Sequence, residues 1–352
     1  MKFYMDSSIF LILVSYNTFI SSPKSSDNTL VTYNDNRPVK ACFVVLVRNS
    51  ELDGIMSTMV QLEKTFNSKF NYPYVFLNDD YFTEEFKERT SALTRAETKY
   101  GKVDQQMWGY PDYINQTLAA ESRAEMAKMN VPYADSESYR HMCRFQSGFF
   151  FRHPLLDEYD YYWRIEPYVD YTCDIDYDVF KFMRNNNKKY GFTITFTEFP
   201  QTVPSLWQTV MNFKRDHPDV VAHWPSKEDS LIKFVASKDE ESYNGCHFWT
   251  NFEIASLELW RSNDYLKFFH YLDQSGGFFY ERWGDAPVHS IAASLMLHKD
   301  KFHFFNDIGY RHSAYTHCPS EPEYRDKCSC DPNISLDYKD PISCLSVYDA
   351  AF

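Results

Sequence analysis

An acidic side chain at a predicted strand end could bind a metal ion and a phosphate-bearing substrate. Glu166 follows the aromatic and apolar stretch 161–165 and precedes Pro167, which forces the chain out of regular strand pairing. A carboxylate in this position is suited to hold a divalent cation that neutralises a diphosphate. Asp174 and Asp176 have the Asp-x-Asp spacing of a metal site, although a solvated acidic loop would show the same pattern. We therefore give Glu166 more weight than the aspartate pair.

Two further carboxylates stand among aromatic and polar side chains. Glu253 lies in the segment 243–254, where the surrounding rings make ionisation costly unless the carboxylate is paired. It could be a nucleophile at the anomeric carbon of a sugar or stabilise positive charge there, but a glutamate at a helix start fits the spacing as well. Asp285 follows Gly284 into a predicted helix, where it is either an N-cap or an acceptor of hydrogen bonds from substrate hydroxyls.

A histidine-rich stretch, 308–319, offers another set of metal ligands. Imidazole suits Mn²⁺ and Zn²⁺, so His312 is a candidate ligand, with a lone surface histidine as the plainer alternative. A zinc-dependent hydrolase built on His312, His317 and Cys318 is the least favoured interpretation, because no helical metal motif accompanies these residues.

Alternating strand and helix patterns must position these side chains. Apolar runs at 41–47 and 72–77 flank a helical pattern at 52–62, which predicts a βαβ unit and hence parallel strands. Further strands are predicted at 161–165, 190–196 and 302–305, and further helices at 205–213, 262–273 and 287–298 and after a cap at 135–138. The sequence therefore predicts an α/β fold with a mostly parallel central sheet flanked by helices, in one large domain over residues 40–352.

Ligands of open α/β sheets bind at the carboxyl ends of the strands. Arg48 follows the first predicted strand, residues 78–80 follow the second, and Glu166 follows the 161–165 strand. We therefore expect Arg48, Asp80 and Glu166 to lie along the same edge of the sheet.

The terminal segments and the cysteines indicate a secretory protein. Residues 1–20 contain a short apolar run that predicts a signal peptide or a short signal anchor, with a buried strand as the alternative, and the polar residues 21–39 predict a stem. Eight cysteines and the sequons at Asn115 and Asn333 favour disulfides in an oxidising lumen over a zinc site.

Charge and composition exclude some partners. The chain has 36 basic and 49 acidic residues, a formal charge of −13, which disfavours nucleic acid. Aromatic residues make up 18% of the chain. Such a content fits sugar binding, because rings stack on the C–H faces of pyranoses, but a core packed with rings explains it equally simply.

Five segments between Ala41 and Pro319 together resemble the fungal α-1,2-mannosyltransferases of glycosyltransferase family 15, which are Golgi type II membrane enzymes. In chain order the segments are YRHMCRFQSGFFFRHPLL, YYWRIEPYVDYTCDIDYD, YNGCHFWTNFEI, ERWGDAPVHSIAASL and GYRHSAYTHCP. The resemblance implies a GT-A-type fold, GDP-mannose as donor and Mn²⁺ as cofactor. It also implies a mannose-bearing glycan as acceptor and α-1,2 transfer with retention of configuration.

The resemblance extends to single residues. It implies that Glu253 is the candidate nucleophile, that Tyr139 contacts the donor or the reacting sugar, and that His312 is a direct metal ligand. By position it places Glu166 in the metal and diphosphate region, Arg144 with the donor, and Asp285 and Trp283 in the acceptor region; Arg48 and Asp80 join the nucleotide end mainly through sheet geometry. Ser313 and Ala314 depart from the pattern, because prolines are expected after the histidine.

Two other classes of function remain open. One is a catalytically inactive relative that binds glycans or scaffolds other transferases. The other is a glycoside hydrolase that uses two carboxylates such as Glu253 and Asp285, and it would need neither nucleotide nor metal.

Overall fold

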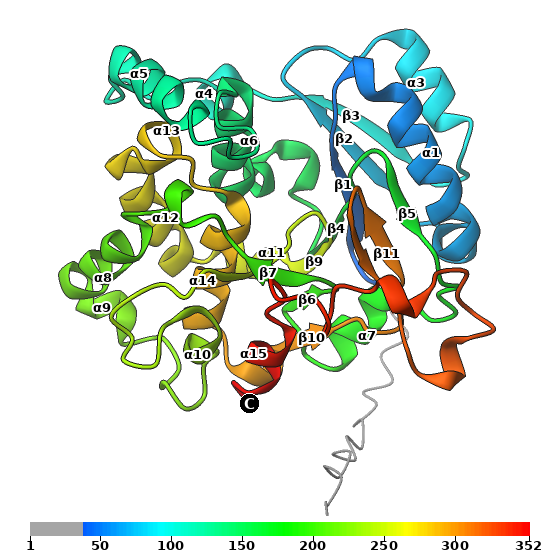
Figure 1. The fold of residues 1–352 in the computed structure, drawn as a ribbon. Coiled ribbons are helices and arrows are strands. Elements are labelled where there is room, and N and C mark those ends of the chain that lie inside the picture. The colour runs from blue at the N-terminus through cyan, green and yellow to red at the C-terminus, as the bar shows by residue number, and fades with distance from the viewer. Residues whose placement is uncertain (1–37) are drawn as a thin grey trace, which may run out of the picture. The chain divides into compact units, whose positions relative to one another are not determined.

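A seven-stranded, mostly parallel sheet runs through residues 38–352, the part of the chain that the computed structural model describes (Figure 1). Its strand order is β10-β6-β9-β4-β1-β2-β3, and only β9 runs antiparallel to its neighbours. The strands are β1 (Ala41–Leu46), β2 (Tyr74–Asn78), β3 (Thr98–Lys102), β4 (Tyr161–Arg164), β6 (Tyr190–Phe192), β9 (Glu253–Ser256) and β10 (Phe302–Phe304). The predicted signal segment, residues 1–20, and the stem up to residue 37 lie outside the described residues.

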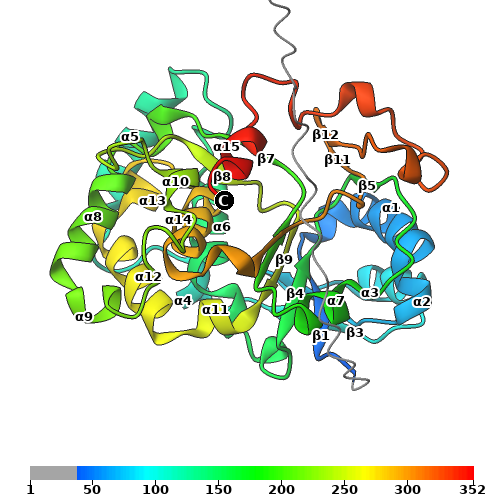
Figure 2. The same ribbon diagram turned by 90° about the horizontal axis from the view of Figure 1, so that it is seen from below.

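Helices cover both faces of this sheet (Figure 2). The strand β1 is apolar along its whole length because each face of the sheet has its own core: Cys42 and Val44 pack on one side, Phe43 and Val45 on the other. The first core includes α5 (Gln116–Ala127), α6 (Glu137–Gly148), α8 (Leu206–Asp216), α11 (Leu257–Arg261), α12 (Asn263–Ser275) and α14 (Asp285–Met296). The second includes α1 (Leu52–Leu62), α3 (Glu84–Ser91) and α7 (Val179–Asn185).

Short helices complete the connections. The remaining α-helices are α2 (Ser68–Phe70), α4 (Gln105–Trp108), α9 (Pro218–Val221), α10 (Ile232–Val235), α13 (Gly277–Tyr280) and α15 (Leu345–Asp349). A π-helical turn, Glu63–Asn67, follows α1, and 3-10 turns lie at Asn49–Glu51, Phe150–Arg152, Pro154–Leu156, Pro200–Thr202, Lys299–Lys301, Pro322–Tyr324 and Pro332–Ile334.

Two small antiparallel sheets stand beside the main one. β5 (Val169–Tyr171), β11 (Tyr310–His312) and β12 (Tyr315–His317) form a three-stranded ribbon, and β7 (Thr195–Thr197) pairs with β8 (Cys246–Phe248). The predicted strand at 190–196 is therefore wrong in its extent. Its first half, β6, pairs with β9 and β10 in the main sheet, whereas its second half, β7, leaves that sheet to pair with β8.

Two disulfides tie the C-terminal segment to the rest of the fold and a third closes a loop within it, which confirms the preference for disulfides. They join Cys173 to Cys328, Cys246 to Cys344 and Cys318 to Cys330, while Cys42 and Cys143 are buried free thiols. The sulfurs of Cys173, Cys328 and Cys330 lie within 4.8 Å of one another, but disulfide bonds already use all three. Within residues 38–352, no helix has the length and apolar character needed to cross a bilayer.

Candidate active site

The parallel strands bring Arg48, Asp80 and Glu166 to the same edge of the sheet, because β1, β2 and β4 all run in one direction. Arg48 follows β1 and donates from Nη2 to Oγ of Ser138 at the start of α6. Asp80 is exposed after β2, and its carboxylate accepts from the backbone N–H of Tyr81. This edge therefore carries an exposed cation on one strand end and a carboxylate on each of two others.

Arg164, the last residue of β4, joins two of the predicted carboxylates. Its Nε donates to Oε1 of Glu166 over 2.6 Å, and its Nη1 donates to Oδ2 of Asp285 over 2.5 Å. Thr250 Oγ1 donates to the same Asp285 oxygen over 2.7 Å. Glu166 Oε2 and Asp285 Oδ1 accept no hydrogen bond within residues 38–352. Each carboxylate thus has one oxygen fixed and one oxygen left for a ligand.

The two carboxyl groups respond differently to the same guanidinium. Burial raises the pKa of Glu166 above its usual value, although Arg164 opposes this. Burial also penalises the charge on Asp285, but the Arg164 charge and the hydrogen bond from Thr250 outweigh it and hold the pKa of Asp285 below its usual value. Asp285 is therefore the firmly ionised member of the pair.

Glu253 is enclosed beneath this pair. It is the first residue of β9, pairs with Arg164 across the strands, and is 1% exposed. The Tyr162 hydroxyl donates to its Oε1, while the Tyr190 hydroxyl (2.7 Å) and His289 Nδ1 (3.0 Å) contact its Oε2. Hydrogen bonds therefore occupy both oxygens of the Glu253 carboxyl group and fix its orientation within the fold.

The β11 strand brings His312 next to the segment that follows Glu166. His312 pairs with Val169 of β5 and stacks on Trp249, with ring centroids 5.3 Å apart. Its Nδ1 lies 3.2 Å from the Asn251 side-chain amide. Burial, and then the positive charge of Arg164, lowers the pKa of His312 below its usual value. The neutral imidazole that results is the form that binds metal ions.

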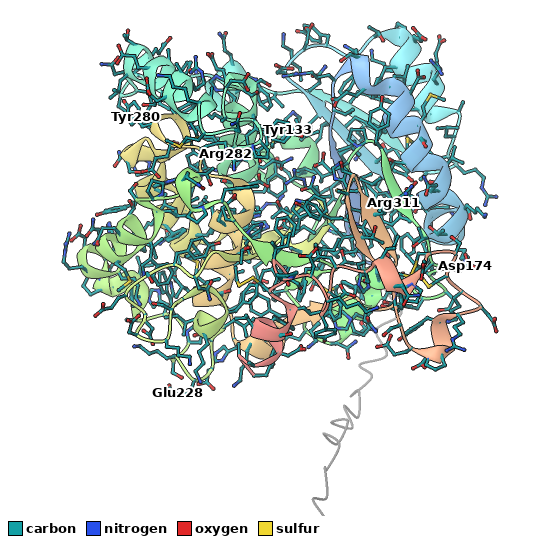
Figure 3. The ribbon with its side chains drawn as sticks, viewed as in Figure 1. Tyr133, Asp174, Glu228, Tyr280, Arg282 and Arg311 are labelled. Atoms are coloured by element: carbon teal, nitrogen blue, oxygen red, sulfur yellow. A yellow bond between two sulfur atoms is a disulfide. The ribbon has the colours of Figure 1, made fainter. Side chains whose placement is uncertain are left out.

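Tyr139 of α6 belongs to an aromatic stack, and Figure 3 labels its stacking partner Tyr133 and the neighbouring Arg282. The Tyr139 ring lies parallel to Tyr133 at 4.6 Å, and the Arg282 guanidinium lies 5.3 Å from the Tyr139 ring. Arg282 also pairs with Glu198. Burial raises the pKa of the Tyr139 hydroxyl well above its usual value, and the Asp285 and Glu198 carboxylates add to the effect. Tyr139 therefore remains a hydrogen-bond donor at neutral pH, near Asp285.

Other predicted residues are not brought to this cluster. Arg144 makes a buried double hydrogen bond to Asp273 on α12, at 2.7 and 2.8 Å. Trp283 is fully buried in the first core, and its Nε1 donates to Glu281. Asp176 pairs with Lys327 on the surface, so the Asp-x-Asp spacing belongs to a solvated loop.

Several residues of the cluster were not predicted from the sequence as candidate site residues. Arg164, Arg282 and His289 stand inside the segments quoted above, so their motifs were visible although their contacts were not. Tyr190 and Glu198 lie outside every quoted motif and carry no local signal. Their roles follow only from strand pairing and from contacts across long stretches of sequence.

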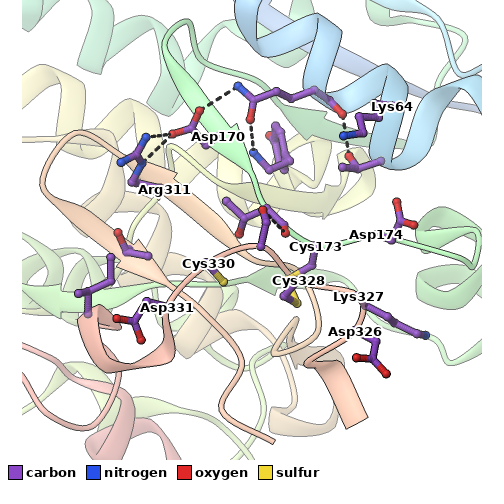
Figure 4. A pocket seen from close by; sticks show the side chains of 17 residues that line it. Lys64, Asp170, Cys173, Asp174, Arg311, Asp326, Lys327, Cys328, Cys330 and Asp331 are labelled. Carbon is purple, nitrogen blue, oxygen red and sulfur yellow. Dashed lines mark hydrogen bonds and ion pairs between the residues drawn. A yellow bond between two sulfur atoms is a disulfide. The ribbon is translucent and has the colours of Figure 1, made fainter. Parts of the chain in front are cut away.

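A separate cleft of about 680 Å³ lies on the outer side of the ribbon (Figure 4). Asp170, Arg311, Lys64 and the Cys173–Cys328 disulfide line it. Successive side chains of a strand point to opposite faces, so Arg311 faces this cleft while His312 faces away from it. Asp174 of the Asp-x-Asp pair lines the cleft, but Glu166, Glu253 and Asp285 do not.

Comparison with known proteins identifies relatives of the chain. A family model described as glycolipid 2-alpha-mannosyltransferase matches residues 16–351. Glycolipid 2-alpha-mannosyltransferase 2 of Candida albicans is 54% identical over 303 residues, which are 86% of this chain and 65% of that relative, so the chain spans a little under two thirds of its length. Alpha-1,2 mannosyltransferase KTR1 of Saccharomyces cerevisiae is 51% identical over 323 residues, 90% of this chain and 81% of the relative.

Two solved structures share the fold. Core-mannan synthase A from Aspergillus fumigatus, in its Mn/GDP form, is 44% identical with a TM-score of 0.79, over 87% of this chain and 83% of that one. The mannosyltransferase Ktr4p from S. cerevisiae, in complex with GDP, is 39% identical with a TM-score of 0.85, over 94% and 86%. These likenesses confirm the predicted α/β fold and the predicted family resemblance.

Proposed function

The chain belongs to the glycolipid 2-alpha-mannosyltransferase family of glycosyltransferases, and on this premise we propose that it transfers mannose from GDP-mannose to a mannose-bearing glycan. The proposed cofactor is Mn²⁺ and the proposed product is an α-1,2 linkage formed with retention of configuration. The observation that carries the proposal is the Glu166–Arg164–Asp285 bridge beside His312, at the edge of a sheet whose solved relatives include a Mn/GDP form and a GDP complex.

The residues at this edge fit Mn²⁺ and a diphosphate. Glu166 offers a free carboxylate oxygen, and His312 offers a neutral imidazole, two ligand types that Mn²⁺ accepts. The Asn251 Nδ2 atom lies 3.2 Å from His312 Nδ1; with this amide turned by 180°, its oxygen would accept the Nδ1 proton and leave the His312 Nε2 lone pair for the metal. When bound, the ion neutralises the diphosphate and eases the departure of GDP. Arg48 at the end of β1 is placed to bind the nucleotide end.

The acceptor glycan is proposed to bind on the α14 side. Asp285 is ionised, and its free Oδ1 can accept a hydrogen bond from the attacking hydroxyl. Tyr139 keeps its proton and can donate to the donor or to the reacting sugar.

Glu253 is proposed to act as a fixed negative charge. A retaining transfer builds positive charge on the mannosyl carbon, and a carboxylate beneath the site stabilises it. Because hydrogen bonds occupy both oxygens of Glu253, its contacts favour this role over that of a covalent nucleophile. The acceptor hydroxyl then attacks from the face on which GDP leaves.

An acceptor screen with the full chain tests the proposal. The purified protein is incubated with GDP-mannose, Mn²⁺ and a panel of mannosides, and the linkage and anomeric configuration of the product are read by NMR. We expect α-1,2-linked mannose, and no product after EDTA treatment until Mn²⁺ is restored. Glycan binding without transfer would favour the inactive relative, and EDTA-resistant sugar release from a mannoside would favour a hydrolase.

We further propose that the protein works in the Golgi lumen, anchored as a type II membrane protein by its N-terminal apolar segment. The three disulfides support an oxidising compartment. Carbonate extraction of fungal membranes tests the anchor: an anchored protein stays in the pellet, whereas a protein whose segment has been cleaved is released.

A further inference from the structure

His289 lies one helical turn after Asp285 on α14, so both side chains project from the same face of the helix. The His289 Nδ1 lies 3.0 Å from Oε2 of Glu253, and both side chains are 1% exposed. One face of α14 is therefore linked to two carboxylates of the candidate site. It carries Asp285, and its His289 contacts Glu253.

The surroundings of His289 fix its ring. Trp260 stacks on it at 4.0 Å with an interplanar angle of 17°. The same tryptophan donates from Nε1 to the Tyr162 hydroxyl over 2.9 Å, and Tyr162 in turn donates to Glu253. Trp260 thus orients two of the three groups that hold Glu253.

The second ring nitrogen of His289, Nε2, indicates that this residue does more than fill space in the core. Its Nε2 is buried and has no hydrogen-bond partner within the described residues. A buried polar atom without a partner lowers stability, so a phenylalanine stacked on Trp260 would fill the same space at less cost. What a phenylalanine could not supply is the contact between Nδ1 and Glu253.

We propose that His289 is a positioning residue for mannosyl transfer, which holds the Glu253 carboxylate in a fixed orientation while the same helix presents Asp285 to the acceptor. The inference rests on the proposed function and deepens it. The α14 helix then sets the spacing between the buried charge and the acceptor-binding carboxylate, because both contacts come from side chains four residues apart on one rigid element.

Two variants of His289 separate positioning from packing. His289→Phe keeps the ring stack on Trp260 but removes the donor. His289→Asn keeps an amide nitrogen close to the place of Nδ1 and loses the stack. We expect His289→Phe to lower kcat by roughly tenfold to hundredfold, because Glu253 is released from its orientation, with KM for GDP-mannose nearly unchanged. We expect His289→Asn to recover most of that loss.

A matched control is His153→Phe, another buried histidine, whose ring nitrogens contact only backbone groups of Lys102 and Leu155. It should change thermal stability without changing kcat. Wild-type kcat in a folded His289→Phe protein would overturn the inference, as would an equal loss in His289→Asn. If His289→Phe fails to fold, His289→Gln replaces it, since its amide lies nearer the place of Nε2. An unmodified protein that transfers no mannose would refute the proposed function, and this inference with it.

Discussion

At the scale of single residues, Arg164 connects the two carboxylates that the sequence placed in different regions of the site. It is 6% exposed, and its planar fork reaches Glu166 and Asp285 at once, which a lysine ammonium could not do with the same geometry. Removing one member of a buried ion pair leaves its partners as uncompensated charges in the fold.

We predict that Arg164→Met lowers the free energy of unfolding by about 3–5 kcal/mol, since it leaves Glu166 and Asp285 unpaired. Urea denaturation measures this loss. Arg89→Met is the matched control, because Arg89 pairs with Asp53 and Glu85 on the surface, and we expect it to cost less than about 1 kcal/mol. Equal losses in the two variants would contradict a bridging role for Arg164.

Glu253 allows a second prediction at this scale. Glu253→Gln keeps the shape of the side chain and removes its charge, so the nucleotide edge around Arg48 and Glu166 should be undisturbed. We expect kcat to fall by about 10²- to 10³-fold, as for loss of one preorganised electrostatic group, while Mn²⁺-dependent GDP affinity stays within about twofold. Steady-state kinetics and calorimetric titration measure the two quantities. Unchanged turnover would remove Glu253 from the mechanism.

At the scale of elements, the β11–β12 hairpin positions His312. Its two-residue turn, Ser313 and Ala314, stands where the family resemblance led us to expect prolines. Ser313 has a φ of +57°, and proline cannot adopt this conformation because its ring fixes φ near −65°. The absence of proline at position 313 is therefore consistent with the tight turn that joins β11 to the antiparallel strand β12.

The conformation of Ser313 predicts that one substitution in the turn stabilises the protein and that another weakens ligand binding. Ser313→Gly should raise the free energy of unfolding by up to about 1 kcal/mol, because glycine adopts positive φ without the steric cost of a Cβ. Ser313→Pro should distort the turn and weaken Mn²⁺-dependent GDP binding by about tenfold or more through His312. Denaturation and titration on the same preparations measure both. If the Ser313→Pro protein bound GDP with the normal dependence on Mn²⁺, His312 would not be a metal ligand.

The elements also show how far the sequence could be interpreted. Long periodic patterns predicted β1, α1, β2, α6, α12 and α14 to within a few residues, because each helix buries one face in one core and each strand buries its two faces in the two cores. The strands β5, β11 and β12 were missed, since three residues are too few to show a period. The candidate site followed the same rule: Glu166 and Asp285 were proposed as site residues from their residue type and position. Their link through Arg164 spans 121 residues and has no local pattern.

At the scale of the whole molecule, the disulfides predict the reactivity of the thiols. All eight cysteines lie in the described residues, and only Cys42 and Cys143 are free. Both are buried, and burial raises the pKa of each thiol above its usual value, so neither should react with maleimide in the native protein. After denaturation without reductant, mass spectrometry should find these two cysteines labelled. Labelling at Cys173, Cys246 or Cys318 would contradict the pairing.

Buried and half-buried histidines make the stability of the whole fold depend on pH. Burial lowers the pKa of His141, His153, His247 and His303 below the usual value near 6.5, and lowers that of His303 to about 3. As the pH falls below 6.5, these histidines bind protons in the unfolded chain but stay unprotonated in the folded protein. The contribution to stability is therefore complete above pH 6.5 and is lost as the pH falls toward the folded-state pKa values.

We expect the free energy of unfolding, measured in urea, to fall between pH 7 and pH 5, by up to about 1.4 kcal/mol per pH unit for each histidine that stays neutral. His303 tests the cause, because it is a single residue of the edge strand β10, packed between Phe182 and Phe305 at 4.4 and 4.6 Å. His303→Phe keeps these ring contacts and cannot bind a proton in either state, so its stability should decline less steeply over the same range. Parallel slopes for the two proteins would show that proton uptake by His303 does not contribute to the acid sensitivity of the fold.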